Sequence, residues 1–289
     1  MILLNGKQIA NEIQTEIAEK VTKRKAEQKK VPHLAAIIVG DDGGSLTYIN
    51  AKIKACEKVG FESSLFAFKN DIREIDLLNK INELNNDENI DGYIVQLPLP
   101  KHIDAKKIIL AIDPKKDVDG FHPENFGRMM QGLPCFIPAT PLGILELLKR
   151  YNIETKGKHC VVVGRSNIVG LPMSVLLAQN ADYGNATVTI AHSYTKNLKS
   201  VCLLADILIV AVGKPEFITA EFIKKGAVVV DVGIHRIENA KTKKNEIKGD
   251  VLFDDVAPHT SYISPVPGGV GPLTICGLLL NTLIACERK

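Results

Sequence analysis

Residues 159–170 read His159-Cys160-Val161-Val162-Val163-Gly164-Arg165-Ser166-Asn167-Ile168-Val169-Gly170. The apolar run that ends at Val163 predicts a buried strand, and a helix is expected from Pro172 to about Gln179. A glycine-rich turn between a strand and a helix is where backbone amides bind the phosphates of a dinucleotide. Ser166 stands where the G-x-G-x-x-G pattern has its second glycine, so the turn alone fits a plain strand-to-helix connection equally well.

Three more strands are expected after this turn, and helical segments separate them. They are Thr187–Ala191, Ile207–Val212 and Ala227–Val232. Strands that alternate with helices predict an α/β fold with a doubly wound, parallel, Rossmann-like sheet.

The residues after the strand at Thr187–Ala191 favour NADP over NAD as the cofactor. An NAD site usually has Asp or Glu at this place, on the ribose hydroxyls. This chain has His192 and Ser193 instead. Arg165 in the turn, together with these two residues, suits a 2′-phosphate. His192 considered alone is more simply a surface residue.

The first half of the chain carries a second candidate site. The apolar run Leu34–Val39 predicts a strand that residues 40–44 end, and Ser45 is expected to cap a helix. On that helix Tyr48 and Lys52 are four residues apart and share one face. The pair fits a catalytic platform at the end of a strand, although a solvated lysine beside a half-buried tyrosine is the commoner meaning of such a pair.

Two polar residues nearby are further candidates. Gln96 follows a strand expected at Ile90–Val95, which Pro98 and Pro100 bring to an end. It therefore lies at a strand's carboxyl end, where ligands bind in open α/β sheets. Asp119 precedes a glycine in a polar loop and is either a turn residue or a ligand contact. A calcium loop is not favoured there, because its later ligands are missing.

The last part of the chain contains a glycine- and proline-rich motif, Ser264–Pro272, before an apolar helix. Its Gly-Gly-x-Gly pattern lets the backbone approach a ligand closely, and Pro272 suits a first helical turn. The helix has more apolar surface than the second domain needs, so it is expected to pack on the first domain. Residues 238–250 are expected to form a hairpin or loop, and residues 250–263 have no clear pattern.

The composition argues against nucleic acid, membrane and metal as partners. The net charge is only +3, and Trp is absent. The longest apolar stretch, Leu273–Ala285, is shorter than the roughly 20 residues of a membrane span and predicts a core helix. The six cysteines are scattered without a Cys-x-x-Cys pair, which indicates a reducing cytoplasm and no zinc site.

Five separated motifs together resemble the bifunctional methylenetetrahydrofolate dehydrogenase/cyclohydrolase family. They are Tyr48-x-x-x-Lys52, Val95-Gln96-Leu97-Pro98-Leu99-Pro100, Lys116–Gly120, Gly164–Gly170 and Pro265–Pro272. The resemblance runs almost end to end. One departure is Asp42-Gly43-Gly44-Ser45, where many relatives have Pro-Ala-Ser.

The resemblance implies two α/β domains with the active-site cleft between them. Residues 1–140 with 270–289 would form the catalytic, folate-binding domain, and residues 141–269 the NADP-binding domain. It also implies a cytoplasmic homodimer that oxidises 5,10-methylenetetrahydrofolate with NADP and then hydrolyses the methenyl product to 10-formyltetrahydrofolate.

The resemblance also implies roles for individual residues. The catalytic residues would be Lys52, Gln96, Tyr48 and Asp119, with Lys52 as the base of the water step. Folate would contact Tyr48, Asp119, Leu99, Gly271 and Pro272. NADP would contact Gly164, Arg165, Ser166, Ser193, Ile234 and Thr274.

Three other functions stay open on the residues alone. They are a monofunctional methylenetetrahydrofolate dehydrogenase, a non-catalytic NADP-binding scaffold, and a dehydrogenase of the shikimate or amino-acid type. A scaffold needs no set such as Lys52, Gln96 and Asp119, so these residues argue against it.

Overall fold

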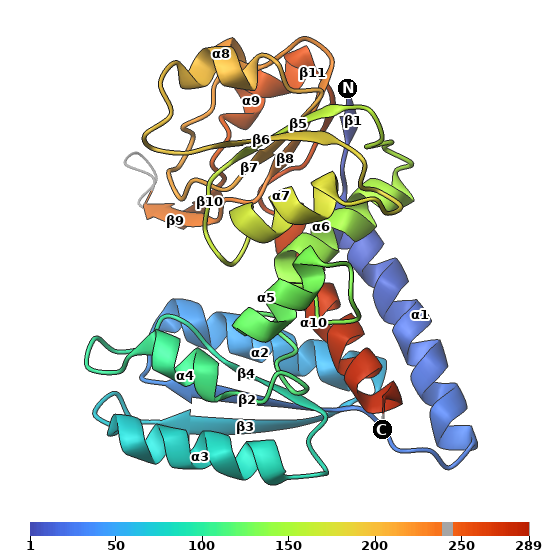
Figure 1. Cartoon of the computed structure of the whole chain (residues 1–289), viewed down its shortest axis with the longest axis vertical. Coiled ribbons are helices and arrows are strands. Elements are labelled where there is room, and N and C mark those ends of the chain that lie inside the picture. Colours follow the sequence, from blue (N-terminus) through green and yellow to red (C-terminus); the bar gives the residue numbers. More distant parts are fainter. Residues whose placement is uncertain (239–244, 289) are drawn as a thin grey trace. The chain divides into compact units, whose positions relative to one another are not determined.

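The computed structural model describes residues 1–238 and 245–288, which fall into two compact units (Figure 1). Unit 1 comprises Met1–Ala10 and Thr140–Thr274, and unit 2 comprises Asn11–Ala139 and Ile275–Lys289. Apart from residue 140, this division differs from the expected domains at residues 1–10 and 270–274, which belong to unit 1. Strand β1 (Ile2–Leu3) pairs in parallel with strand β11 (Thr260–Ile263) of unit 1.

Unit 1 is built on a six-stranded sheet in the order β1-β11-β8-β7-β5-β6. Every pairing in it is parallel, so the predicted doubly wound sheet is confirmed. Four of its strands were expected from the sequence: β5 (His159–Val163), β6 (Thr187–Ala191), β7 (Ile207–Val210) and β8 (Ala227–Asp231). The helices of this unit's sheet connections are α7 (Gly170–Ala178), α8 (Leu198–Cys202) and α9 (Phe253–Val256).

A separate antiparallel hairpin extends from unit 1. Strand β9 (His235–Glu238) pairs with β10 (Asn245–Lys248). A hairpin or loop was expected at residues 238–250; strand β10 lies in that segment, but strand β9 begins earlier, at His235. Residues 239–244 lie outside the described residues.

Unit 2 contains a three-stranded parallel sheet in the order β3-β2-β4. Its strands are β2 (His33–Val39), β3 (Glu62–Phe68) and β4 (Gly92–Val95). Alternate β2 residues such as Ala35 and Ile37 pack in one cluster with Leu77, Ile81 and Ile108. Those three residues belong to helices α3 (Glu74–Asn86) and α4 (Ala105–Ala111), which therefore cover one face of the sheet.

The remaining helices of unit 2 include one that the sequence did not predict. Helix α2 (Gly43–Val59) packs against β2 and β3. Helix α5 (Pro123–Met130) was missed because its eight residues lie in a segment rich in Pro and Gly. Three longer helices supply residues to both units: α1 (Gly6–Ala26), α6 (Ala139–Arg150) and α10 (Val270–Glu287).

Helix α10 is long and apolar enough to cross a membrane by those two criteria alone, yet most of it is buried inside the protein. Its unit 2 portion includes Asn281, which is 1% exposed. The Asn281 side-chain amide donates to the carbonyls of Val118 and Ile137, both at 2.8 Å. A polar residue paired in this way indicates a helix of a protein core, as the sequence predicted.

Candidate active site

Lys52 and Gln96 form a hydrogen-bonded pair in unit 2. Lys52 is 7% exposed, and its Nζ donates to Gln96 Oε1 at 3.2 Å. Gln96 follows β4, and its amide Nε2 donates to the Leu97 carbonyl at 2.7 Å, which orients Oε1 toward the lysine. The buried amine of Lys52 is therefore oriented by the side chain of Gln96, at the end of strand β4.

The helix that carries Lys52 begins earlier than expected. Asp42, rather than Ser45, is its N-cap, because the Asp42 carboxylate accepts the Ser45 amide at 2.8 Å. The Asp-Gly-Gly segment that departs from the family pattern thus still provides a capping side chain.

Asp119 lies close enough to Lys52 for their charges to interact. Burial raises the pKa of Asp119, and the positive charge of Lys52 acts in the opposite direction. Among the described residues, no donor hydrogen-bonds the Asp119 carboxylate. The turn is instead held by Asp117, which accepts the amides of Phe121 and His122 and the side chain of Asn125. Asp119 is therefore not needed as a turn residue, and its oxygens are free to accept hydrogen bonds from a ligand.

Tyr48 lies one helical turn before Lys52 and is half-buried. Burial raises the pKa of Tyr48, so the side chain is a neutral phenol at physiological pH. Leu99 is partly buried and packs against the apolar cluster of β2 and β4. The ring of Tyr48 offers an aromatic face of the kind on which a planar ligand stacks.

A hollow of 390 Å³ lies at the carboxyl ends of strands β5, β6 and β7 in unit 1. Strand β6 pairs with one side of β5 and strand β7 with the other, so the order in which the chain adds strands reverses at β5. Open α/β sheets bind ligands at such a switch point. The lining residues are Val163, Gly164, Arg165, Ser166, His192, Ser193, Thr195, Leu198, Ala211, Val212, Lys214 and Phe217.

Gly164 and Ser166 shape the turn of this hollow. Gly164 has φ +128°, and a Cβ there would lie 2.2 Å from the Ala211 carbonyl oxygen. Ser166 replaces the second glycine of the phosphate pattern, and its Oγ accepts the amides of Val169 and Gly170 at 3.1 and 3.4 Å. The serine hydroxyl thus accepts hydrogen bonds from two amides at the start of α7. In other dinucleotide folds, amides at this place bind a phosphate of the cofactor.

The charge of the lining fits a cofactor with a 2′-phosphate. Arg165 and Lys214 are its cations, and the lining contains no Asp or Glu among the described residues. The guanidinium carbon of Arg165 lies 5.7 Å from the ring centroid of Tyr194, a cation–π distance. Lys214 was not predicted, although its position just after β7 in Val212-Gly213-Lys214-Pro215 was the available signal.

Besides the unit 2 residues described above, four residues predicted to contact ligands do not line this hollow. Ile234 is 45% exposed beyond the end of β8. Thr274 hydrogen-bonds Thr140 at 2.9 Å, and Gly271 and Pro272 lie in the first turn of α10. Contacts of these four residues with folate or NADP stay predictions.

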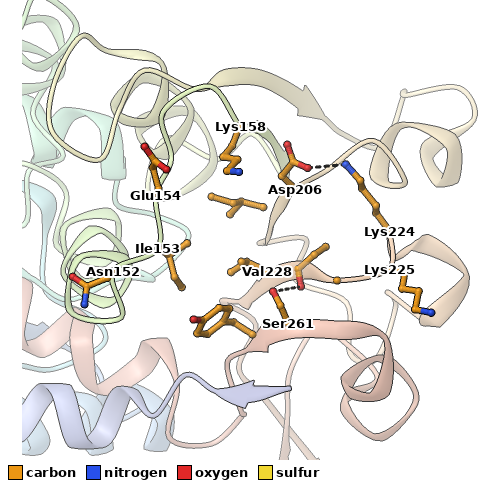
Figure 2. A pocket seen from close by; sticks show the side chains of 13 residues that line it. Asn152, Ile153, Glu154, Lys158, Asp206, Lys224, Lys225, Val228 and Ser261 are labelled. Carbon is orange, nitrogen blue, oxygen red and sulfur yellow. Dashed lines mark hydrogen bonds and ion pairs between the residues drawn. The ribbon is translucent and has the colours of Figure 1, made fainter.

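A second hollow, of 350 Å³, lies at the opposite, amino ends of the unit 1 strands (Figure 2). Figure 2 shows Asp206 paired with Lys224, and the Asp206 carboxylate also accepts the His159 amide at 2.9 Å. The charges that line this second hollow are thus partly neutralised. In addition, dinucleotides bind at the carboxyl ends of the strands of a parallel sheet and not at this end. Within residues 1–238 and 245–288, no group of three His, Cys, Asp or Glu side chains is placed to hold a metal ion.

Two family descriptions match the chain. Residues 4–119 match the catalytic domain of tetrahydrofolate dehydrogenase/cyclohydrolase, and residues 138–289 match its NAD(P)-binding domain. The protein "Bifunctional protein FolD" of Cytophaga hutchinsonii is 62% identical over 291 residues, covering 100% of both chains.

Solved structures agree with this match. The bifunctional enzyme FolD, methylenetetrahydrofolate dehydrogenase/cyclohydrolase, of Campylobacter jejuni has a TM-score of 0.93 and 44% identity, covering 100% of this chain and 99% of that one. The methylenetetrahydrofolate dehydrogenase-cyclohydrolase of Trypanosoma brucei, complexed with NADP and an inhibitor, has a TM-score of 0.93 and 35% identity, covering 100% and 98%. With both domains matched in order and the relatives matched over almost their whole length, the chain belongs to the tetrahydrofolate dehydrogenase/cyclohydrolase family.

Proposed function

We propose that the protein oxidises 5,10-methylenetetrahydrofolate to the methenyl cation with NADP and then hydrolyses this cation to 10-formyltetrahydrofolate. The observation that carries the proposal is the buried Lys52–Gln96 pair with the Asp119 carboxylate beside it. A redox step alone requires no buried amine, whereas adding water requires a proton acceptor.

The hydride step depends on alignment of two reactants rather than on an acid or base. NADP, when bound, supplies the hydride acceptor. Arg165 and Ser193 would hold the 2′-phosphate, with Gly164 and Ser166 at the phosphate turn, and all four line the hollow of unit 1. Ile234 and Thr274 would complete the cofactor contacts.

The water step would use Lys52 as general base. Its amine is buried in unit 2, within hydrogen-bond distance of Gln96. Gln96 would hold the amine toward the reacting carbon through the hydrogen bond to Oε1.

Folate would be held by Asp119 and by the Tyr48 ring. An ionised Asp119 can accept two N–H bonds from the donor edge of a pterin, and no described residue competes for its oxygens. The Tyr48 ring would stack on the aminobenzoyl group. Leu99, Gly271 and Pro272 would provide the remaining, largely apolar contacts.

We further propose that the protein acts as a homodimer in the cytoplasm, with no nucleic acid or membrane as partner. The small net charge and the scattered free cysteines support this environment. Sedimentation equilibrium would test the dimer.

One absorbance assay tests the two activities together. Methenyltetrahydrofolate should form from methylenetetrahydrofolate with NADP, and more slowly or not at all with NAD, and should then decay to the formyl product. Formation without enzyme-dependent decay would indicate a monofunctional dehydrogenase. Neither formation nor decay, with NADP still bound, would indicate a scaffold.

A further inference from the structure

Asp250 is a fully buried carboxylate that the proposed chemistry does not use. It follows strand β10 and lies between the hairpin and the main sheet of unit 1. A buried carboxylate is costly unless strong hydrogen bonds compensate it, so its partners indicate what it does.

Three consecutive backbone amides donate to this carboxylate. Oδ2 accepts the amides of Val212 at 2.7 Å and Gly213 at 3.1 Å, and Oδ1 accepts the amide of Lys214 at 2.9 Å. His235 Nε2, from strand β9, lies 2.7 Å from the same Oδ1. Three backbone donors and one histidine ring therefore converge on a single carboxylate.

The three amides belong to a loop that lines the candidate cofactor hollow. Val212 and Lys214 both belong to its lining, directly after strand β7. Since the amides are paired with Asp250, the loop offers the hollow its side chains instead, including the Lys214 cation. The Lys214 ammonium lies 5.4 Å from the Phe217 ring centroid, and Phe217 belongs to the same lining.

Asp250 is itself held from the opposite side. Its own amide donates to Asp231 Oδ1 at 3.0 Å, and the next amide, of Val251, donates to Asp231 Oδ2 at 2.9 Å. Asp231 ends strand β8. The Asp250 carboxylate is thus fixed to the sheet through its backbone and to the loop through its side chain.

We propose that Asp250 is a positioning residue for cofactor binding, which holds the Val212–Lys214 loop in the conformation that lines the dinucleotide hollow. The inference rests on the proposed function only in taking NADP as the ligand of that hollow. Because Asp250 holds the backbone of the loop, its loss should weaken the binding of both NADP and NAD.

The test is the Asp250→Asn variant of the full chain, with NADP and NAD affinities measured by calorimetry. Asn keeps the shape of the Asp side chain but replaces one acceptor oxygen with an NH₂ group, which faces amides that donated to the carboxylate. We expect both dissociation constants to rise by at least about 10-fold, since an unpaired buried donor carries a cost of that order. The cyclohydrolase kcat/KM, which needs no cofactor, should stay within about twofold of the parent value.

Asp206→Asn is the matched control. Asp206 also accepts a backbone amide and pairs with a lysine in unit 1, but it lies at the amino ends of the strands (Figure 2). This variant should leave both dinucleotide affinities within about twofold.

Three outcomes would overturn the proposal. They are unchanged dinucleotide affinity in folded Asp250→Asn, an equal fall in cyclohydrolase activity, and a loss confined to NADP. If Asp250→Asn does not fold, His235→Ala decides, because it removes one donor and leaves the backbone contacts. About a threefold rise in both dissociation constants is then expected for loss of one hydrogen bond, and no change would refute the role. If the parent protein binds NADP but shows no turnover, the proposed function is contradicted. The dinucleotide affinities of Asp250→Asn and the parent protein can still be compared.

Discussion

Replacing Lys52 with Met should separate the two activities. Met keeps the length and the apolar stem of a side chain that is 7% exposed, so it leaves no large cavity. It removes the amine and the hydrogen bond to Gln96 Oε1. Hydride transfer needs no proton acceptor and water addition does, so the water step should suffer far more.

The sizes of the two effects follow from these contacts. Loss of general base catalysis typically costs about 10²–10⁴-fold, which is the fall expected for the cyclohydrolase. The dehydrogenase loses only the positioning supplied by one hydrogen bond of about 0.5–1.5 kcal/mol, or about 2- to 13-fold. Methenyltetrahydrofolate should therefore accumulate in a coupled absorbance assay with methylenetetrahydrofolate and NADP.

Two comparisons sharpen the Lys52 experiment. Lys54→Met alters an exposed lysine on the same helix and should leave both rates nearly unchanged. Lys52→Arg should not restore the water step, because a guanidinium stays charged at any working pH and cannot accept the proton. Should both activities fall by one common factor in Lys52→Met, Lys52 binds substrate and another group is the base.

Three more outcomes are expected. Asp119→Asn places a donor against the donor edge of the pterin, so folate-analogue binding should collapse while NADP binding survives; unchanged analogue affinity in calorimetry would contradict the role. Because Lys52 lowers the pKa of Asp119, which burial raises, Lys52→Met should raise that pKa further. Binding of the folate analogue requires an ionised Asp119. As the pH falls, Lys52→Met should therefore lose its affinity for the analogue at a higher pH than the parent protein does. Superimposed pH profiles of the two proteins would argue against this coupling. Arg165→Ala should weaken NADP by about 10- to 150-fold, the equivalent of 1.5–3 kcal/mol for a charge-assisted contact, with little effect on NAD. Equal weakening in steady-state kinetics would show that Arg165 does not recognise the 2′-phosphate.

Local patterns predicted all three strands of the unit 2 sheet and four of the six strands of the main sheet of unit 1. Runs such as Leu34–Val39 and His159–Val163 are apolar, β-branched and bounded by glycine, so their burial can be inferred from neighbouring residues alone. The observed strands β2 and β5 lie at these positions. The nearness of Lys52 and Gln96 could be inferred in part, because Gln96 follows strand β4 and Lys52 lies on the helix that follows the neighbouring strand β2.

The missed features depend on partners far away in the chain. Strand β1 has only two residues, and its partner β11 lies more than 250 positions later, so no local pattern marks either strand. Asp250 follows a hairpin in a polar segment, and only the fold brings the amides of residues 212–214 to it. The cap at Asp42 was assigned to Ser45 because several capping residues lie within four positions.

The contribution of the final residues to both units has a consequence for biosynthesis. Strand β11 and residues Ile275–Lys289 leave the ribosome after most of both units has been made. Until then strand β1 has no partner, and the Val118 and Ile137 carbonyls lack the amide of Asn281. Each unit therefore receives its last hydrogen bonds from a segment far along the sequence, so neither unit can complete its folding before residues 260–281 have been made.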